Sequence, residues 1–122
     1  MVKTVKITTD NKISVVEMPS WSLEEQEKVI GAECTELVKT QIMYDLFRER
    51  IVMIVDESGH IKGRAKNAVA SYLYGYQKHG TPIVGDVIFG MQNGPDILPL
   101  ENADLVKFFL KDKFSYLQDA EV

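Results

Sequence analysis

Cationic side chains that could bind an anion are concentrated in residues 60–80 of an otherwise acidic chain. Lys62, Arg64 and Lys66 occupy alternate positions, so an extended backbone would point all three side chains in the same direction. No Asp or Glu lies within this stretch to neutralise them. Because Lys and Arg donate charge-assisted hydrogen bonds to anionic groups, the stretch is predicted to form an anion-binding site.

Backbone donors and aromatic rings accompany these cations. Asn67 is predicted to cap a short helix that runs to Leu73, and the free N–H groups at a helix start favour a bound anion. Three tyrosines follow at every second position, and a tyrosine ring can stack on a nucleobase. The predicted anion- or nucleotide-binding residues are Lys62, Arg64, Lys66, Asn67, Tyr72, Tyr74, Tyr76 and His79. In the alternative interpretation, the cations form the solvated face of a strand and the tyrosines pack or cover an interface.

Patterns typical of catalysis or metal binding are not found. A zinc site needs about four Cys, His or carboxylate ligands, and Cys34, His60 and His79 lack a recognisable spacing. Ser58 lies near His60, but a Ser-Gly pair after a strand is typical of a turn. Residues 63–67 lack the Gly-Lys-Ser/Thr ending of a phosphate-binding P-loop. We therefore predict no catalytic residue, no metal site and no cofactor.

Length and charge limit the classes of protein to which the chain can belong. Its 122 residues predict one domain, residues 1–122, and 45% apolar with 26% charged residues is typical of a globular protein. The net charge of -4 disfavours broad nucleic-acid binding, which depends on many phosphate contacts. A single cysteine, no leader segment and no apolar run of membrane-spanning length predict a cytoplasmic protein without membrane contact.

The first half of the chain predicts mainly strands. Residues 3–18 alternate apolar and polar positions around an Asp-Asn-Lys turn, which is typical of a β-hairpin. A Ser-x-x-Glu capping box and a terminal glycine delimit a helix over residues 23–30. Residues 33–40 predict a return to strand. The continuous β-branched and apolar run at 51–55 predicts a buried central strand.

The second half of the chain mixes helices and strands. Residues 41–50 are compatible with either a turn of helix or a packed loop. Residues 82–90 predict a second strand, and residues 93–100 predict an irregular connection. Residues 103–118 predict an amphipathic helix. Its apolar side chains are expected on two adjoining faces, Leu105, Phe108 and Phe109 on one and Leu110, Phe114 and Leu117 on the other. The predicted fold class is α+β: one small domain with a mainly antiparallel sheet, an N-terminal hairpin, short helices and a C-terminal amphipathic helix.

Several short motifs occur in a characteristic order between Val5 and Gly90. After the strand pair and the short helix, the apolar strand at 51–55 runs into an acidic-Gly turn and then a Gly-x-x-x-Asn step. A later strand has Val-Gly-Asp at its centre. In this order the chain resembles a family of small uncharacterised proteins, a domain-of-unknown-function family, from phages and other mobile elements of Gram-positive bacteria. The resemblance implies an accessory protein in the host cytoplasm and implies no activity.

Function is therefore predicted only as a class. We expect a non-enzymatic accessory protein that acts against or regulates a host system, either by binding a host protein or by sequestering a small anionic, nucleotide-type ligand. One alternative is an enzyme acting on a phosphorylated or nucleotide substrate, with His60 or His79 as acid or base. A nucleic-acid-binding regulator is another alternative. We also expect a homo-oligomer, because so small a domain has little room for an enclosed pocket and a subunit interface can supply one.

Overall fold

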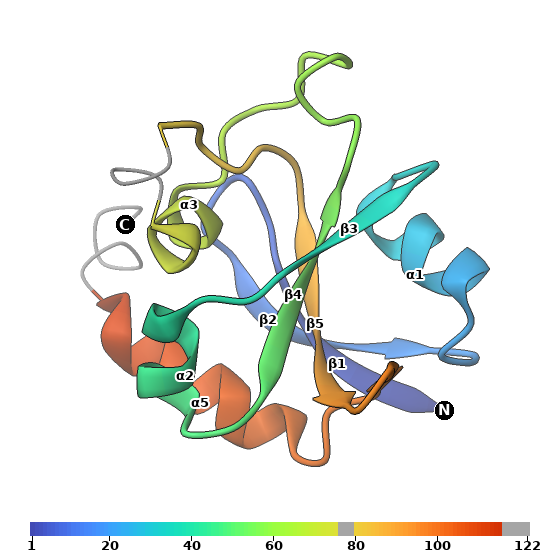
Figure 1. The fold of residues 1–122 in the computed structure, drawn as a ribbon, viewed down its shortest axis with the longest axis vertical. Helices are drawn as coiled ribbons and strands as arrows, with labels where there is room; N and C mark the ends of the chain where they lie inside the picture. The colour runs from blue at the N-terminus through green and yellow to red at the C-terminus, as the bar shows by residue number, and fades with distance from the viewer. Residues whose placement is uncertain (76–79, 116–122) are drawn as a thin grey trace.

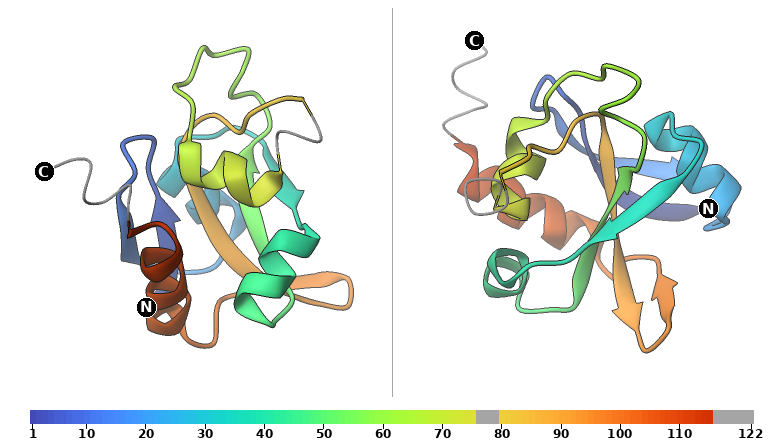
Figure 2. Two further views of the ribbon diagram at one scale, coloured as in Figure 1. Left: turned by 90° about the vertical axis from the view of Figure 1, so that its left-hand side faces the viewer. Right: turned by 45° about the horizontal axis from the view of Figure 1, so that its top comes forward.

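One antiparallel sheet of six strands forms the centre of the molecule, and helices lie on both of its faces (Figures 1 and 2). The structure is a computed structural model that describes residues 1–75 and 80–115. The strands are β1 (Val2–Ile7), β2 (Ile13–Met18), β3 (Thr35–Val38), β4 (Ile51–Asp56), β5 (Val87–Asn93) and β6 (Asp96–Leu98). The helices are α1 (Leu23–Ile30), α2 (Gln41–Phe47), α3 (Ala68–Tyr74) and α5 (Ala103–Lys113). The predicted α+β class is confirmed.

Strand pairing places β5 in the middle of the sheet. The strands follow the order β2-β1-β5-β4-β3, and the N-terminal hairpin of β1 and β2 is present as predicted. On the side opposite β4, the start of β5 pairs with β1 and its end pairs with β6. Between these two pairings the buried Thr4 hydroxyl donates to the carbonyl of Phe89 at 2.6 Å. This bond continues the contact of β1 with β5 beyond their backbone ladder.

Both faces of β4 are covered, which explains its continuous apolar sequence. The left view of Figure 2 shows α2, α3 and α5 in front of the sheet and α1 behind it. Met53 and Val55 belong to the larger core under α2, α3 and α5, whereas Ile54 belongs to a smaller cluster under α1. A strand that is covered on both faces is apolar at every position rather than at alternate ones.

The three short helices begin at capping side chains. Ser22 accepts from the N–H of Glu25, so α1 starts where the capping box predicted, and Gly31 ends it in the left-handed region with a φ of 70°. Thr40 caps α2, which settles the segment at 41–50 as a helix followed by a short loop. Asn67 caps α3 as predicted. Among the described residues, no helix is long and apolar enough to span a membrane.

Three predicted features differ from the structure. The strand predicted at 82–90 is β5, which begins only at Val87, after Gly85 at a φ of 84°, and runs to Asn93. Residues 96–98, which were expected to be irregular, form β6, because they pair with the end of β5 and because Trp21 Nε1 donates to the carbonyl of Ile97 at 3.0 Å. Of the two predicted apolar faces of α5, one is buried through Leu110 and Phe114, and the other is exposed at Leu105 and Phe108. Leu117 lies outside the described residues.

Candidate functional site

A buried carboxylate brings together two of the predicted anion-binding residues. Lys62 Nζ lies 3.0 Å and Arg64 Nε 3.5 Å from Oδ2 of Asp56, whose side chain has no exposed surface. Oδ1 of Asp56 accepts from the N–H of Ser58 at 2.9 Å. The carboxylate at the end of β4 therefore organises the turns that follow it.

The same two cations also bind the end of α1. Lys62 Nζ lies 3.5 Å from the carbonyl oxygen of Gly31, and Arg64 Nη2 donates to the same oxygen. Residues 58–63 form turns, with Gly63 at a φ of 70°, so the expectation of an extended backbone was wrong here. The two side chains converge through these turns and already have bonded partners at their charged ends.

Lys66 and Asn67 lie apart from this pair. Lys66 is exposed and forms an isolated β-bridge with Val84. Asn67 is fully buried: its Nδ2 donates to the carbonyls of Ile7 at 3.1 Å and Gly85 at 2.9 Å, and its Oδ1 caps α3 by accepting from the N–H of Ala70. The amide of Asn67 thus joins three segments of the backbone.

The described tyrosines of the predicted site make packing contacts. The ring of Tyr72 packs edge-on against Phe114, with centroids 5.4 Å apart, and Lys113 Nζ lies 5.4 Å from the Tyr72 ring centre. Tyr74 is partly buried against the larger core. Tyr76 and His79 lie outside the described residues. The structure therefore does not gather the described members of the predicted set into one binding surface.

Lys62 and Arg64 also line an open hollow of about 560 Å³. Its lining consists of Thr9, Lys62, Gly63, Arg64, Ala65, Gly85 and Asp86. The hydrocarbon part of Arg64 lies over Gly85, and the carboxylate of Asp86 pairs with Lys6 at 3.5 Å. Each charged group at this hollow has a partner within the protein, which lowers its capacity to bind a small anion.

The described residues considered for catalysis show no nucleophile bonded to a base. Nε2 of His60 is 2.9 Å from the carbonyl oxygen of Pro82, and Cys34 is exposed at the start of β3. Within the ranges 1–75 and 80–115, no three His, Cys, Asp or Glu side chains lie close enough to hold a metal ion.

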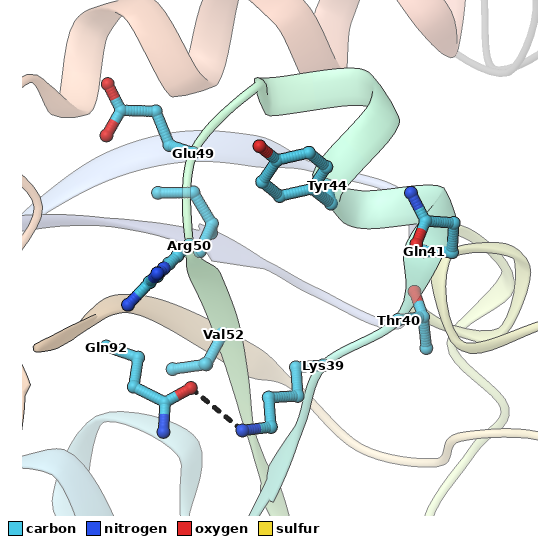
Figure 3. A pocket seen from close by; sticks show the side chains of 9 residues that line it. Lys39, Thr40, Gln41, Tyr44, Glu49, Arg50, Val52 and Gln92 are labelled. Atoms are coloured by element: carbon cyan, nitrogen blue, oxygen red, sulfur yellow. Dashed lines mark hydrogen bonds between the residues drawn. The ribbon is translucent and has the colours of Figure 1, made fainter. Parts of the chain in front are cut away.

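A different pair of cations lines a pocket at the other end of β4, shown in Figure 3. Its volume is about 280 Å³. The lining residues are Lys39, Thr40, Gln41, Tyr44, Glu49, Arg50, Ile51, Val52 and Gln92. We name it the Lys39–Arg50 pocket.

This pocket exists because β4 extends beyond its neighbour β3. Their pairing stops at Val38 and Met53, so Ile51 and Val52 have no strand beside them on this side in the part of the chain that the structure describes. The chain leaves β3, forms α2 and returns to β4 at Ile51. The space between α2 and the uncovered end of β4 forms the pocket.

Hydrogen bonds to the backbone hold the walls of the pocket in place. The Thr40 hydroxyl donates to the carbonyl of Leu73 at 2.6 Å and accepts from the N–H of Met43, which fixes the start of α2. The N–H of Gln92 donates to the carbonyl of Arg50 at 2.9 Å, which extends the contact between β5 and β4. The Lys39–Arg50 pocket is thus built on anchored segments.

Its charge is mainly cationic. Lys39 Nζ donates to Oε1 of Gln92 at 2.9 Å, a neutral partner that leaves the ammonium charge uncompensated (Figure 3). Arg50 is exposed and makes no ion pair with any described residue. Figure 3 shows the carboxylate of Glu49 pointing away from Lys39 and Arg50, toward α5.

An aromatic ring lies at the same pocket. Tyr44 on α2 is 49% exposed, and Figure 3 shows its ring between Gln41 and Glu49, on the far side of the pocket from Gln92. A site for small phosphorylated ligands needs cations that bind the anion, an aromatic ring on which a planar group can stack, and amide groups that form hydrogen bonds. The pocket offers all three kinds of group.

Sequence reasoning missed this pocket because its residues are distant in the chain. The available signal was weak: Lys39 and Arg50 flank the segment between two predicted strands, and antiparallel pairing brings such flanking positions to the same edge of a sheet. Gln92 could not be added to them without knowledge of the strand order.

Comparison with known proteins finds no relative: no family model, no curated protein and no solved structure matches the chain. A functional proposal therefore depends on the charges, contacts and volume of the pocket itself.

Proposed function

We propose that this is a non-enzymatic binding protein that takes a small nucleotide-type ligand in the Lys39–Arg50 pocket. One observation carries the proposal: Lys39, just after β3, and Arg50, just before β4, line one pocket and have no carboxylate partner among the described residues. Two uncompensated cations at a single concave site favour an anion of one or two charges.

The ring of Tyr44 supports a ligand with a planar part. A half-exposed tyrosine beside two cations can stack on a nucleobase while the cations bind the phosphate. The amide of Gln92 already holds Lys39, and that of Gln41 donates to Asp45 at 2.9 Å. Both amides retain further donor or acceptor capacity for the edge of a base.

Volume and charge favour a mononucleotide over a polymer. A pocket of about 280 Å³ lies near the lower end of the range for small-molecule sites. The net charge of -4 opposes the long-range attraction that an oligonucleotide needs. We include in this proposal the accessory role in a phage or mobile element that the sequence resemblance implies. Sequestration of a small nucleotide is compatible with such a role.

The test is thermal unfolding in the presence of AMP, cyclic AMP, ADP, inorganic phosphate and a short oligonucleotide. A ligand at a hundred times its dissociation constant adds about 2.7 kcal/mol to the free energy of unfolding. For a domain of this size, that free energy corresponds to a rise in melting temperature on the order of 10 °C. The variant Lys39→Ala/Arg50→Ala is expected to lose the shift.

Two control variants locate the effect. Lys3→Ala/Lys12→Ala removes the same charge from exposed positions of the N-terminal hairpin and is expected to keep the shift. Lys62→Ala/Arg64→Ala is expected to melt at a lower temperature but to keep the ligand-induced rise. No rise with any ligand, or a rise that only Lys62→Ala/Arg64→Ala abolishes, contradicts the proposal.

A further inference from the structure

Helix α5 has an exposed apolar side that no described segment covers. Val106 and Leu110 point into the larger core, whereas Leu105 is 48% and Phe108 62% exposed. Leu105 and Phe108 lie three residues apart and are therefore neighbours on the outer side of the helix. Large exposed apolar side chains that adjoin one another are typical of interaction surfaces.

An apolar recess begins beside these two side chains. It has a volume of about 270 Å³ and lies between α5 and the adjacent ends of β4 and β5. Leu105 and Phe109 line it on the helix side, and Ile51 and Met91 line it on the sheet side. The ring of Phe109 packs at an angle against the ring of Phe108, with centroids 6.0 Å apart. The recess and the exposed side of α5 therefore form one continuous surface, which we name the α5 surface.

Carboxylates surround the α5 surface. Asp104 and Asp112 lie four residues before and after Phe108, so each is one turn away from it, and both are exposed. Glu49 and Glu101 are exposed residues that line the recess. None of these four carboxylates makes an ion pair with any described residue.

One cation lies among these carboxylates. Lys111 is exposed, lies one turn after Phe108 and makes no ion pair with any described residue. Of the other two lysines of α5, Lys107 is half-buried and Lys113 lies over the ring of Tyr72. Four carboxylates beside a single ammonium group give the α5 surface a negative net charge.

This charge disfavours three kinds of partner. A second copy of the chain, with its α5 antiparallel and centred on Phe108, would set Asp104 against Asp112, and like charges that face one another across an interface are costly. Anionic lipid head groups and the phosphates of nucleic acids would also be repelled. The α5 surface is therefore complementary to a partner that is both apolar and basic.

We propose that the α5 surface binds a basic, amphipathic segment of another protein. One apolar side chain of that segment enters the recess, and its other apolar side chains cover Leu105 and Phe108. Lys or Arg side chains at the edges of the segment form charge-assisted hydrogen bonds with the carboxylates of Asp104, Asp112 and Glu101.

This proposal does not rest on the proposed function. The recess and the Lys39–Arg50 pocket share Glu49 and Ile51, but Phe108 does not line the pocket. Lys39→Ala/Arg50→Ala is expected to bind the basic segment at least as tightly as the parent protein does, because both substitutions remove positive charge close to Glu49. Loss of ligand binding in this variant is thus separable from loss of segment binding.

Two synthetic amphipathic peptides test the proposal, one of leucine and lysine and the other of leucine and glutamate in the same order. Isothermal titration calorimetry measures how tightly each peptide binds the full chain. We expect the leucine–lysine peptide to bind and the leucine–glutamate peptide to show no binding. In amide NMR spectra, the leucine–lysine peptide is expected to shift the signals of Met91, Leu105 and Phe108 and to leave those of Gly63 and Gly85 unchanged.

Variants of the α5 surface separate its apolar and charged contributions. Phe108→Ser is expected to weaken binding of the leucine–lysine peptide about tenfold or more. Asp104→Lys/Asp112→Lys is expected to reverse the preference, so that the leucine–glutamate peptide binds more tightly. Glu24→Lys/Glu33→Lys makes the same change of charge at exposed positions in and just after α1, on the other face of the sheet, and is expected to keep the parent's preference. Far-ultraviolet circular dichroism establishes that each variant is folded.

Four results overturn the proposal. The first is no binding of the leucine–lysine peptide, and the second is binding that shifts signals only outside α5 and the recess. The third is an equal reversal of preference in Glu24→Lys/Glu33→Lys, because net charge alone then attracts the peptide. The fourth is a different occupant: either self-association of the parent or its binding to phosphatidylcholine vesicles, abolished in each case by Phe108→Ser.

Discussion

Arg64 Nε lies 3.5 Å from Oδ2 of Asp56, a carboxylate with no exposed surface. Lys62 reaches the same oxygen, and both cations also contact the carbonyl of Gly31. Because a buried carboxylate requires compensating charge, these contacts couple the end of β4 to the end of α1. The most cationic part of the sequence thus has a structural role that its composition did not reveal.

Replacing Asp56 with Asn should lower the free energy of unfolding by about 1–3 kcal/mol. The amide keeps the size of the carboxylate but leaves Lys62 and Arg64 without a counter-charge. Their partial exposure, 26% and 39% of each side chain, limits the loss because water can solvate them. Urea denaturation of the two proteins measures the difference.

Asp86→Asn provides the matched control for Asp56→Asn. Asp86 forms one ion pair, with Lys6, and its side chain is 30% exposed. Its replacement should cost less than about 1 kcal/mol, because water still reaches both members of this pair and the Asn side chain can still accept from the N–H of Thr9. Equal losses in the two variants would contradict a special role for the Asp56 carboxylate.

Asn67→Ala should destabilise the protein more than Asn102→Ala does, although both residues cap helices. Asn102 is exposed and, among the described residues, accepts from the N–H of Leu105 alone, so its loss should cost about 1 kcal/mol. Loss of Asn67 also removes the buried amide that donates to the carbonyls of Ile7 and Gly85, which adds about 1–3 kcal/mol. Thermal unfolding of both variants tests this order, and the reverse order would show that the buried amide is not important for stability.

Gly90→Ala should disturb the contact of β5 with β6. An added methyl group would lie 2.8 Å from Cγ2 of Ile97 and 2.9 Å from Cζ2 of Trp21, so we expect a loss of about 1–3 kcal/mol. Since Trp21 is the only tryptophan, its fluorescence should shift to longer wavelength as the ring becomes more exposed.

The double variant Gly90→Ala/Ile97→Ala identifies the cause of that loss. Removing Cγ2 of Ile97 relieves one of the two close contacts, so the Gly90→Ala substitution should cost less in this background than in the parent. Costs that simply add would exclude steric contact with Ile97 as the reason.

Local sequence signals predicted the fold where the determinants are local. The capping box of α1, the hairpin and the buried run of β4 all rest on residues that are neighbours in the chain. By contrast, β6 depends on pairing with β5 and on the bond from Trp21, 76 residues away in sequence, so its short segment showed no strand pattern of its own. The choice of which α5 face is buried likewise depends on the sheet beneath it.

The candidate site was harder to predict than the fold. Lys62 and Arg64 were visible because they are close in sequence, yet turns direct them to Asp56 rather than to solvent. Lys39, Arg50 and Gln92 meet only because β3 ends before β4 and β5 continues beside it. The spacing of these residues along the chain does not indicate that β3 is shorter than β4 and β5.

The most direct test of the proposed function is an NMR titration of the ¹⁵N-labelled protein with AMP, because it shows where the ligand binds. We expect saturable shifts of the amide signals of Lys39, Tyr44, Ile51 and Gln92, with the signals of Gly63 and Gly85 unchanged. Shifts confined to Gly63 and Gly85 would place the site at the hollow beside Arg64 and contradict the account. An AMP titration that moves no signal would also contradict it.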